Sequence, residues 1–277
     1  MSVSTNVPAT PTAAPRSSAR LGAYAWWQVR DYLVDRGTPT ALIGLLFGYM
    51  VGGPMLSGVS MRLVRMSPAA LERAGGMDAA RAAMLGELVG TFLSLLLGNL
   101  VFLGALFAMN GIVANDRKLG FYRFLFSKPL SPERYYGQAF AIHWAGFLFV
   151  FALMGLLFHA LVAPVLTLPL FAAVGLMFLC YAGITFALSA AARWDWLSLV
   201  AVTVASNYLW TRYGESRSAL AGLLYLFPPL HRTSEVYTAV ATNVALPWHL
   251  LGWFAAYGAI CFVIGLVVLR HRRLAII

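Results

Sequence analysis

The sequence predicts an all-α polytopic membrane protein with six transmembrane helices. The chain has 277 residues, of which 60% are hydrophobic and only 11% are charged, whereas soluble domains carry about 25% charged residues. Several stretches approach or exceed the ~20 apolar residues that are needed to cross the hydrocarbon core of a bilayer. Because lipid offers no water to backbone polar groups, stretches of this kind must be helical.

Six stretches of the chain are predicted to be these helices. In order, they are Thr38–Leu56, Leu85–Val113, Ala139–Val162, Leu166–Ala191, Leu197–Trp210 and Pro247–Leu269. The fifth is the shortest. The apolar segment that follows it is interrupted by Pro228 and Pro229, so it predicts a half-membrane or interfacial excursion rather than a seventh span.

The chain before the first span divides into a tail and a short helix. Residues 1–19 are rich in Ser, Thr, Pro and Ala and predict a disordered cytoplasmic tail, with a transit peptide as a minor alternative. Residues 20–277 then form a single transmembrane domain. An amphipathic helix at the cytoplasmic membrane surface is expected before the first span, with Trp26 and Trp27 at interface depth. Its apolar ladder is Leu21, Ala25, Val29 and Leu33, and its polar side is Gln28, Asp31 and Asp35.

The distribution of charge predicts the orientation of the chain. Six spans place both termini on one side, and that side carries 13 of the 20 Lys and Arg residues but only five of the ten acids. By the positive-inside rule this side is cytoplasmic, as in a bacterial inner membrane protein. The net charge of +10 therefore reflects membrane topology and does not indicate a nucleic-acid partner.

The loop between the second and third spans, residues 115–138, predicts a helix, a sharp turn and a second helix on the cytoplasmic side. Phe121, Phe124 and Leu125 share one face of the first helix. Pro129 ends that helix, since the residue before a proline is driven out of the α region. We call residues 115–138 the elbow.

The second helix of the elbow has a clear start signal. Ser131 is suited to the N-cap, Pro132 to the first helical position, and Glu133 to the positive end of the helix dipole. Two interpretations follow from these residues alone. The elbow aromatics rest in the lipid headgroups, or they form a rigid knob that enters a groove on a soluble partner.

The elbow resembles the cytoplasmic loop between spans two and three of exporter-type (type 2) ABC transporter permeases. The family pattern is Glu-Arg-x-x-Gly-Thr, a leucine, Pro-hydrophobic-Ser, and then an aromatic residue before Gly-Lys. The matching stretches here are Asp116-Arg117-Lys118-Leu119-Gly120, Leu125, Pro129-Leu130-Ser131 and Tyr135-Tyr136-Gly137-Gln138. The chain departs from the pattern at Asp116 for Glu, Phe121 for Thr and Gln138 for Lys. The similarity also covers the amphipathic N-terminal helix, the six spans, and the proline-broken segment, which is a re-entrant hairpin in the family.

This resemblance implies a permease subunit that homodimerises and binds two copies of a separate ABC ATPase subunit. ATP and Mg would be bound by that partner, with no cofactor in this chain. The residues implied to couple to the ATPase are Asp116, Arg117, Gly120, Phe121, Arg123, Phe124, Leu125, Pro129, Ser131 and Arg134.

The chain is not expected to be an enzyme itself. A phosphate-binding P-loop requires Gly-Lys-Ser/Thr, but the only lysines, Lys118 and Lys128, follow Arg117 and Ser127. The spans contain almost no ionisable residues, so the energy for transport would come from outside the membrane. A membrane anchor or assembly factor that moves no solute is the alternative function, and a membrane-embedded enzyme is the third.

Several further residues are candidates for packing or binding. Glycines at four-residue spacing in the first span, and alanines in the fifth, would lie in the dimer seam that the family forms from these spans, or would pack helices within one protomer. They are Gly44, Gly48, Gly52, Ala201 and Ala205.

Polar residues are candidates for lining a pathway or for hydrogen bonds between helices, namely Asn99, Asn110, Ser206 and Asn207. His231 and Glu235 are either a metal-binding pair or an ordinary surface pair. The outer loop Ser57–Gly86 predicts an amphipathic helix, or a pair of helices, broken by glycine.

Overall fold

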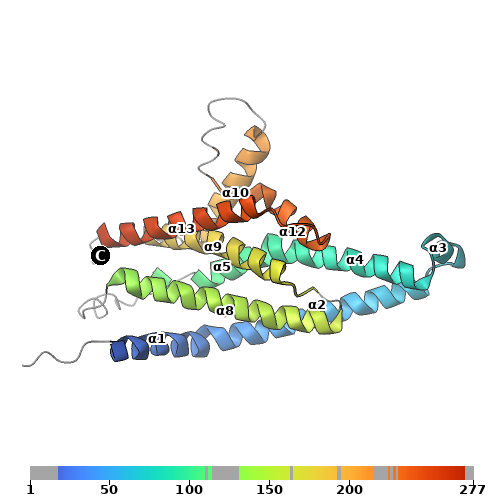
Figure 1. Ribbon diagram of the computed structural model, residues 1–277, viewed down its shortest axis with the longest axis horizontal. Helices are drawn as coiled ribbons and strands as arrows, with labels where there is room; N and C mark the ends of the chain where they lie inside the picture. Colours follow the sequence, from blue (N-terminus) through green and yellow to red (C-terminus); the bar gives the residue numbers. More distant parts are fainter. Residues whose placement is uncertain are drawn as a thin grey trace, which may run out of the picture.

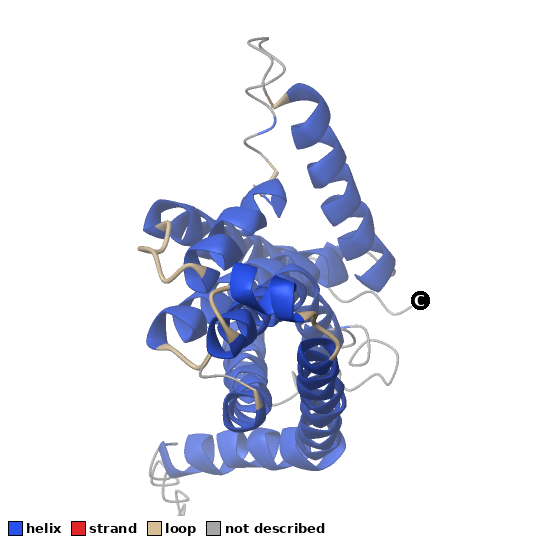
Figure 2. Ribbon diagram, turned by 90° about the vertical axis from the view of Figure 1, so that its right-hand side faces the viewer, coloured by secondary structure: helices blue, strands red, loops and turns tan. Residues whose placement is uncertain are grey.

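The structure is a computed structural model that describes residues 18–109, 112–113, 131–162, 165–191, 195–214, 224, 227–228 and 230–271. Within these ranges the chain forms helices joined by turns and short loops, without strands (Figure 2). The elements are α1 (Ser18–Tyr32), η1 (Leu33–Gly37), α2 (Thr38–Val64), α3 (Pro68–Arg73), α4 (Met77–Leu95), η2 (Leu96–Leu100), α5 (Val101–Met109), α8 (Pro132–Leu161), α9 (Leu168–Ala191), α10 (Asp195–Tyr213), η3 (Leu230–Arg232), α12 (Thr233–Ala241) and α13 (Trp248–His271).

Five helices of the described chain are long and apolar enough to cross a membrane. They are Gly44–Val64, Met77–Met109, Pro132–Leu161, Leu168–Ala191 and Trp248–His271. An all-α, multi-pass membrane architecture is therefore confirmed. The predicted fifth span lies in α10, a helix of 19 residues that is not among the five. Its polar residues, which include Asp195, Asn207 and Arg212, lower its hydropathy.

The long helices lie side by side along one axis, and α9 is the most deeply buried of them (Figure 1). One end of the bundle carries α1, the start of α8 and the end of α13, and we call it the α1 end. The opposite end carries α3, and we call it the α3 end. In Figure 1, α10 stands away from the bundle at a steep angle.

Helices α9 and α13 cross with almost no side chain between them. A Cβ atom added at Gly183 of α9 would overlap the carbonyl oxygen of Gly258 in α13 and lie 2.8 Å from its Cα. A Cβ added at Gly258 would in turn lie 2.7 Å from the Cα of Cys180. Glycine at both positions is therefore what permits this backbone contact.

The same contacts show that α9 and α13 run in the same direction. Gly183 faces Gly258, and further along both helices Phe186 faces Gly265. Residue numbers thus rise together on the two helices. Because both helices end at the α1 end, the chain must return from that end between Ala191 and Trp248 (Figure 1). In the sequence, helix α10 lies in this interval.

The segment predicted as an outer loop, Ser57–Gly86, consists of the end of α2, the short helix α3 and the start of α4, so the two long helices extend further into it than the sequence predicted. Helix α2 continues to Val64, and α3 follows, with the Ser67 hydroxyl accepting a hydrogen bond from the Ala70 N–H at 3.3 Å. Gly75 and Gly76 then have φ angles of 82° and 103°, which other residues rarely adopt, and α4 begins at the next residue. These two glycines produce the break between the helices.

Helix α1 is continuous with α2 through the π-helical turn η1, and a π turn is a common place for a helix to bend. In Figure 2, which looks along the bundle, α1 is the lowest helix and runs across the view. It packs on α8, where the Tyr32 ring lies against Gly146 and makes an edge contact with His143, at 4.9 Å between ring centroids. Trp26 and Trp27 are exposed, as expected for an interface helix.

The polar side of α1 is partly covered by protein. Gln28 was grouped with Asp31 on the polar face, yet only 8% of its surface is exposed, whereas Leu33 of the predicted apolar ladder is 44% exposed. The packing of α1 on α8 decides which face is covered. In a membrane-surface helix the exposed apolar side chains can face lipid instead of protein.

Candidate functional site

The helix start predicted within the elbow is confirmed. The Ser131 hydroxyl accepts a hydrogen bond from the Arg134 N–H at 3.3 Å, and Pro132 is the first residue of α8. Ser131 has extended backbone angles (φ −77°, ψ 139°), as an N-cap requires. Glu133 lies in the first turn, where the helix dipole favours a negative charge. The end of the elbow is therefore a well-defined helix start.

The other predicted coupling residues lie outside the described residues, as does Asn110. They are Asp116, Arg117, Gly120, Phe121, Arg123, Phe124, Leu125 and Pro129. Arg134, by contrast, is described and exposed on the first turn of α8.

A group of aromatic rings holds the first turns of α8 against α9 and α13. We call Tyr136, Phe140, Phe186 and Phe262 the aromatic cluster. Their rings form a chain, with centroid separations of 5.8 Å from Tyr136 to Phe186, 4.7 Å from Phe186 to Phe262, and 4.5 Å from Phe262 to Phe140. Tyr136 and Phe186 are each only 1% exposed. This cluster was not predicted, because nothing in the sequence separates these aromatics from the many others in the spans.

The aromatic cluster gives the start of α8 mechanical contact with two other helices. Phe186 comes from α9, Phe262 from α13, and the remaining two rings from α8. Interiors packed in this way transmit displacement, because close-packed side chains have little free volume. A displacement of the first turns of α8 would therefore reach α9 and α13 through these rings.

The glycine face of α2 is occupied by α8 of the same chain. A Cβ at Gly44 would lie 2.9 Å from Val150, one at Gly48 would lie 3.3 Å from Met154, and one at Gly52 would lie 3.3 Å from Val162. Of the two interpretations offered for these glycines, packing within one protomer is the one that the contacts support. On α10, Ala201 is exposed and Ala205 is half-buried.

The polar candidates of the spans have different environments. The Ser206 hydroxyl is fully buried and donates a hydrogen bond to the Pro228 carbonyl oxygen at 2.7 Å, so it joins α10 to the proline-broken segment. Asn99, in the π-helical turn η2, and Asn207, in α10, are exposed. Ser206 therefore links α10 to the proline-broken segment.

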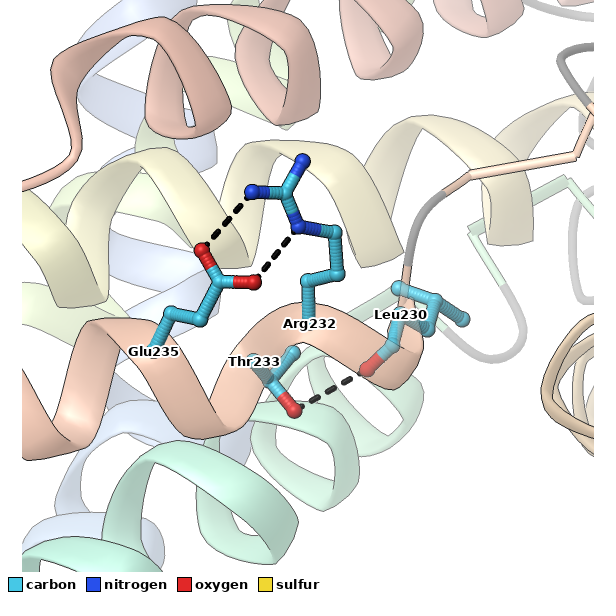
Figure 3. A network of polar contacts seen from close by, with 4 residues as sticks. All are labelled: Leu230, Arg232, Thr233 and Glu235. Atoms are coloured by element: carbon cyan, nitrogen blue, oxygen red, sulfur yellow. Dashed lines mark hydrogen bonds and ion pairs between the residues drawn. The ribbon is translucent and has the colours of Figure 1, made fainter. Parts of the chain in front are cut away.

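A second contact between α10 and the proline-broken segment was missed by the sequence analysis. The Trp210 indole and the His231 imidazole are stacked, with ring centroids 4.5 Å apart and planes inclined by 21°. The next residue, Arg232, forms a bidentate ion pair with Glu235, at 2.6 and 2.8 Å (Figure 3). The Thr233 hydroxyl also donates to the Leu230 carbonyl oxygen at 3.0 Å.

These contacts bear on the alternative interpretations of His231 and Glu235. Each side chain has its own partner, since Glu235 is bound by Arg232 and His231 lies on Trp210. The part of the chain that the structure describes contains no group of three or more His, Cys, Asp or Glu side chains that could hold a metal ion. The Arg232 hydrogen bond lowers the pKa of Glu235 from its ordinary value. Burial, and then the charge of Arg232, lower the pKa of His231, while Glu235 opposes this shift.

We expect the lowered pKa of His231 to make the protein less stable in mild acid. A group with a depressed folded-state pKa binds fewer protons in the folded state, so its contribution is present above about pH 6.5 and is lost as the pH falls through the folded pKa. The Glu235 ion pair loses its contribution only at lower pH. Thermal unfolding in detergent, compared between about pH 7.5 and about pH 5.5, should therefore show a smaller acid-induced decrease for His231→Phe than for the wild type.

The control for this measurement is His159→Phe, because His159 is exposed at the end of α8. This variant should retain the acid-induced decrease of the wild type. If His231→Phe lost as much thermal stability in acid as the wild type does, a group other than His231 would be responsible for the loss.

Comparison with models of known protein families, with characterised proteins and with solved structures finds no match to this chain.

Proposed function

We propose that the protein is the membrane subunit of an ATP-driven ABC exporter, which homodimerises and binds two copies of a separate ATPase subunit through the elbow. The observation that carries this proposal is the elbow sequence, residues 115–138, with its resemblance to the coupling loop of type 2 permeases. The Ser131 cap and the aromatic cluster support it. A coupling element requires a defined helix start that is packed into the membrane helices.

The proposal includes α10 as the fifth of six spans. Helices α9 and α13 run in the same direction, so residues 192–247 return the chain along the bundle, and α10 is the longest described helix in that return. The described part of the proline-broken segment contains η3 and α12, of three and nine residues. These are far too short to span a bilayer.

The proposed orientation places the α1 end of the bundle in the cytoplasm of a bacterium. Arg30 of α1, Arg134 of α8 and Arg270 of α13 are exposed at this end, and the whole-chain count, with 13 of the 20 Lys and Arg residues on this side, supports the orientation through the positive-inside rule. An ATPase that binds the elbow would then lie on the side where ATP is present.

In the proposed mechanism, this chain transmits the movement of the ATPase subunits to its membrane helices. ATP binding closes the two ATPase subunits and displaces the elbows. Each elbow moves the start of α8, and the aromatic cluster carries that displacement to α9 and α13. No residue of this chain takes part in ATP hydrolysis.

Replacing the elbow side chains with alanine tests this function directly. We expect Arg123→Ala combined with Phe124→Ala to reduce the amount of P-loop ATPase that co-purifies with the tagged chain by at least about tenfold, since central aromatic and arginine contacts dominate interfaces. The co-purifying protein is identified by mass spectrometry, and its ATP hydrolysis is measured in the complex. Arg65→Ala combined with Phe149→Ala is the control, because both residues are exposed and neither belongs to the elbow.

The competing outcomes of this experiment are distinct. If the double elbow variant retains both the ATPase and coupled hydrolysis, the aromatic residues of the elbow face lipid and the coupling proposal fails. If the ATPase binds but inverted vesicles show no ATP-dependent transport, the chain is an anchor or assembly factor. If no P-loop protein co-purifies with the intact chain, the exporter proposal is contradicted.

A further inference from the structure

Helices α4 and α5, with the π-helical turn η2 between them, carry an exposed ridge along one side of the second span. The ridge residues recur at every fourth position, and each of them is exposed. They are Thr91, Leu95, Asn99, Leu103 and Phe107, and we call them the α4 ridge. Phe92, Leu96 and Leu97, on other sides of the same span, are at most 1% exposed. The span is therefore packed into the bundle on one side and left uncovered along the ridge.

The turn η2 keeps the polar residues of the ridge on one face. In an α-helix with 3.6 residues per turn, residues four apart are offset by about 40°, so such a ridge drifts around the helix. A π turn is wider and rotates less per residue, and in η2 the Val101 N–H bonds to the Leu96 carbonyl oxygen, five residues earlier. The side chain of Asn99 therefore stays close to the line of Thr91 and Leu95.

Asn99 lies deep within the membrane. The run Leu88–Asn115 contains no ionisable residue, and it is bordered by Glu87 and Asp116. Because a charged side chain is costly at the centre of a bilayer, the hydrocarbon core begins close to Glu87. Asn99 is about 18 Å beyond Glu87 along the helix, which is more than half of the ~30 Å thickness of the core. Its amide group is thus near the middle of the bilayer.

The Asn99 amide has no hydrogen-bond partner within the part of the chain that the structure describes, and its side chain is exposed. The Thr91 hydroxyl, by contrast, donates to the Glu87 carbonyl oxygen at 3.0 Å. An amide that faces hydrocarbon is strongly unfavourable, because lipid tails offer neither a donor nor an acceptor. Asn99 therefore requires a partner from outside the described protomer.

A second copy of the same chain supplies such a partner. The Asn side chain carries both a donor and an acceptor, so two Asn99 amides can satisfy each other. Two copies with the same orientation in the membrane are related by a twofold axis along the membrane normal, so each residue lies at the same depth as its counterpart. Leu95 and Leu103, one turn on either side of the amide, are apolar and suit a dry contact between helices rather than a water-filled path.

The space beside the ridge allows a second helix to approach closely. Gly90 and Gly98 each precede a polar ridge residue, and a Cβ added at either glycine would meet no atom within 4 Å. No helix of the described chain therefore covers this side. The glycine face of α2, the other candidate for a contact between copies, is already occupied by α8.

We propose that the α4 ridge is a contact surface between two copies of this chain, in which the two Asn99 amides are hydrogen-bonded to each other near the middle of the membrane. Leu95 and Leu103 pack against their counterparts in the second copy. This inference rests on the homodimer of the proposed function. It does not rest on ATPase binding or on transport, since it is built from α4, η2 and α5 alone.

Cysteine substitutions on the ridge test the contact directly in membranes treated with copper phenanthroline. We expect Leu95→Cys and Leu103→Cys each to give at least about tenfold more disulfide-linked dimer than the wild type, because Cα atoms at a close helix contact lie within the ~7 Å that a disulfide allows. The native Cys180 and Cys261 give the background in the wild type. Phe149→Cys in α8 is the matched control, because Phe149 is exposed within a span but lies off the ridge, and it should give no more than background.

Replacement of Asn99 tests the hydrogen bond between the copies. We expect Asn99→Leu to weaken dimerisation of the full chain by about threefold to tenfold, measured by native mass spectrometry over a concentration series in detergent. Asn99→Gln keeps the donor and the acceptor and should lose less. Asn207→Leu, which removes an exposed amide from α10, should dimerise as the wild type does. Gly90→Leu should also weaken the dimer but leave the chain folded, because the protomer leaves space there.

The outcomes separate this contact from the homodimer itself. If the chain is dimeric but the ridge cysteines cross-link no more than Phe149→Cys does, the homodimer stands and the ridge is not its contact surface. If Asn207→Leu weakens the dimer and Asn99→Leu does not, the contact lies on α10 and the inference is overturned. A wild type that is monomeric both in detergent and in membranes would contradict the ridge and the proposed homodimer together.

Discussion

Replacing Gly183 with alanine is expected to destabilise the protein by about 2–3 kcal/mol, because the new Cβ would overlap the Gly258 carbonyl oxygen. The atom in the way belongs to backbone and not to a flexible side chain, so α9 and α13 must move apart. Their separation removes contacts along both helices, including the contact of Phe186 with Gly265. The measurement is the SDS fraction at which helix content is lost in mixed micelles, followed by circular dichroism.

The matched control is Gly252→Ala in α13. Gly252 is exposed, and a Cβ there would meet no atom within 4 Å. Alanine has a better helix propensity than glycine by about 1 kcal/mol, so this variant should be as stable as the wild type or slightly more stable. Equal midpoints for Gly183→Ala and Gly252→Ala would mean that the two helices do not cross as closely as described.

Replacing Phe186 with alanine is expected to have the second large effect. Phe186 is 1% exposed, and its ring contacts Tyr136 of α8 and Phe262 of α13, so its removal leaves a cavity at the centre of the aromatic cluster. Phenylalanine-to-alanine changes in soluble cores cost about 3–5 kcal/mol. In a bilayer the free energy gained by burying an apolar side chain is smaller, because the alternative environment is lipid, but the lost packing contacts still count. We therefore expect the free energy of unfolding to fall by about 2–3 kcal/mol.

The control for Phe186→Ala is Phe149→Ala in α8, where the ring is 58% exposed. The same atoms are removed from a position with few protein neighbours, so the SDS midpoint should remain within about 0.5 kcal/mol of the wild type. A similar loss in the two variants would contradict the special role of the cluster.

Phe186→Ala also separates ATPase binding from coupling under the proposed function. The elbow itself is unchanged in this variant, so the ATPase should still co-purify with the chain. Transport into inverted vesicles should fall, because the start of α8 is no longer held against α9 and α13. Loss of ATPase binding in Phe186→Ala would place the cluster in the docking surface rather than behind it.

The helix start at Ser131 was predicted because its signals are local. A capping hydroxyl, a proline at the first helical position and an acid in the first turn act within four residues of one another, so the sequence suffices to identify them. The long apolar spans were recognisable for a similar reason, since hydropathy is a property of each segment alone. The break of the outer loop at Gly75 and Gly76 is equally local.

The partners of each helix face were not predictable in this way. The spacing of Gly44, Gly48 and Gly52 identifies a smooth face, but it does not say whether that face meets α8 or a second copy of the chain. The burial of Gln28 was not predictable for the same reason, because α1 has two faces that can each be covered by lipid or by protein. The stacking of Trp210 on His231 joins segments far apart in sequence, and no local pattern encodes it.

The sequence by itself determined that this chain is a helical membrane protein, where most of its long helices lie, and how α8 begins. Each of these follows from hydropathy or capping within a single segment. Only the tertiary structure decided that α9 and α13 cross backbone to backbone at Gly183 and Gly258 and run in the same direction. Such pairings depend on which helix faces meet, and in a chain whose spans are apolar on every side the sequence pattern does not distinguish a protein-facing surface from a lipid-facing one.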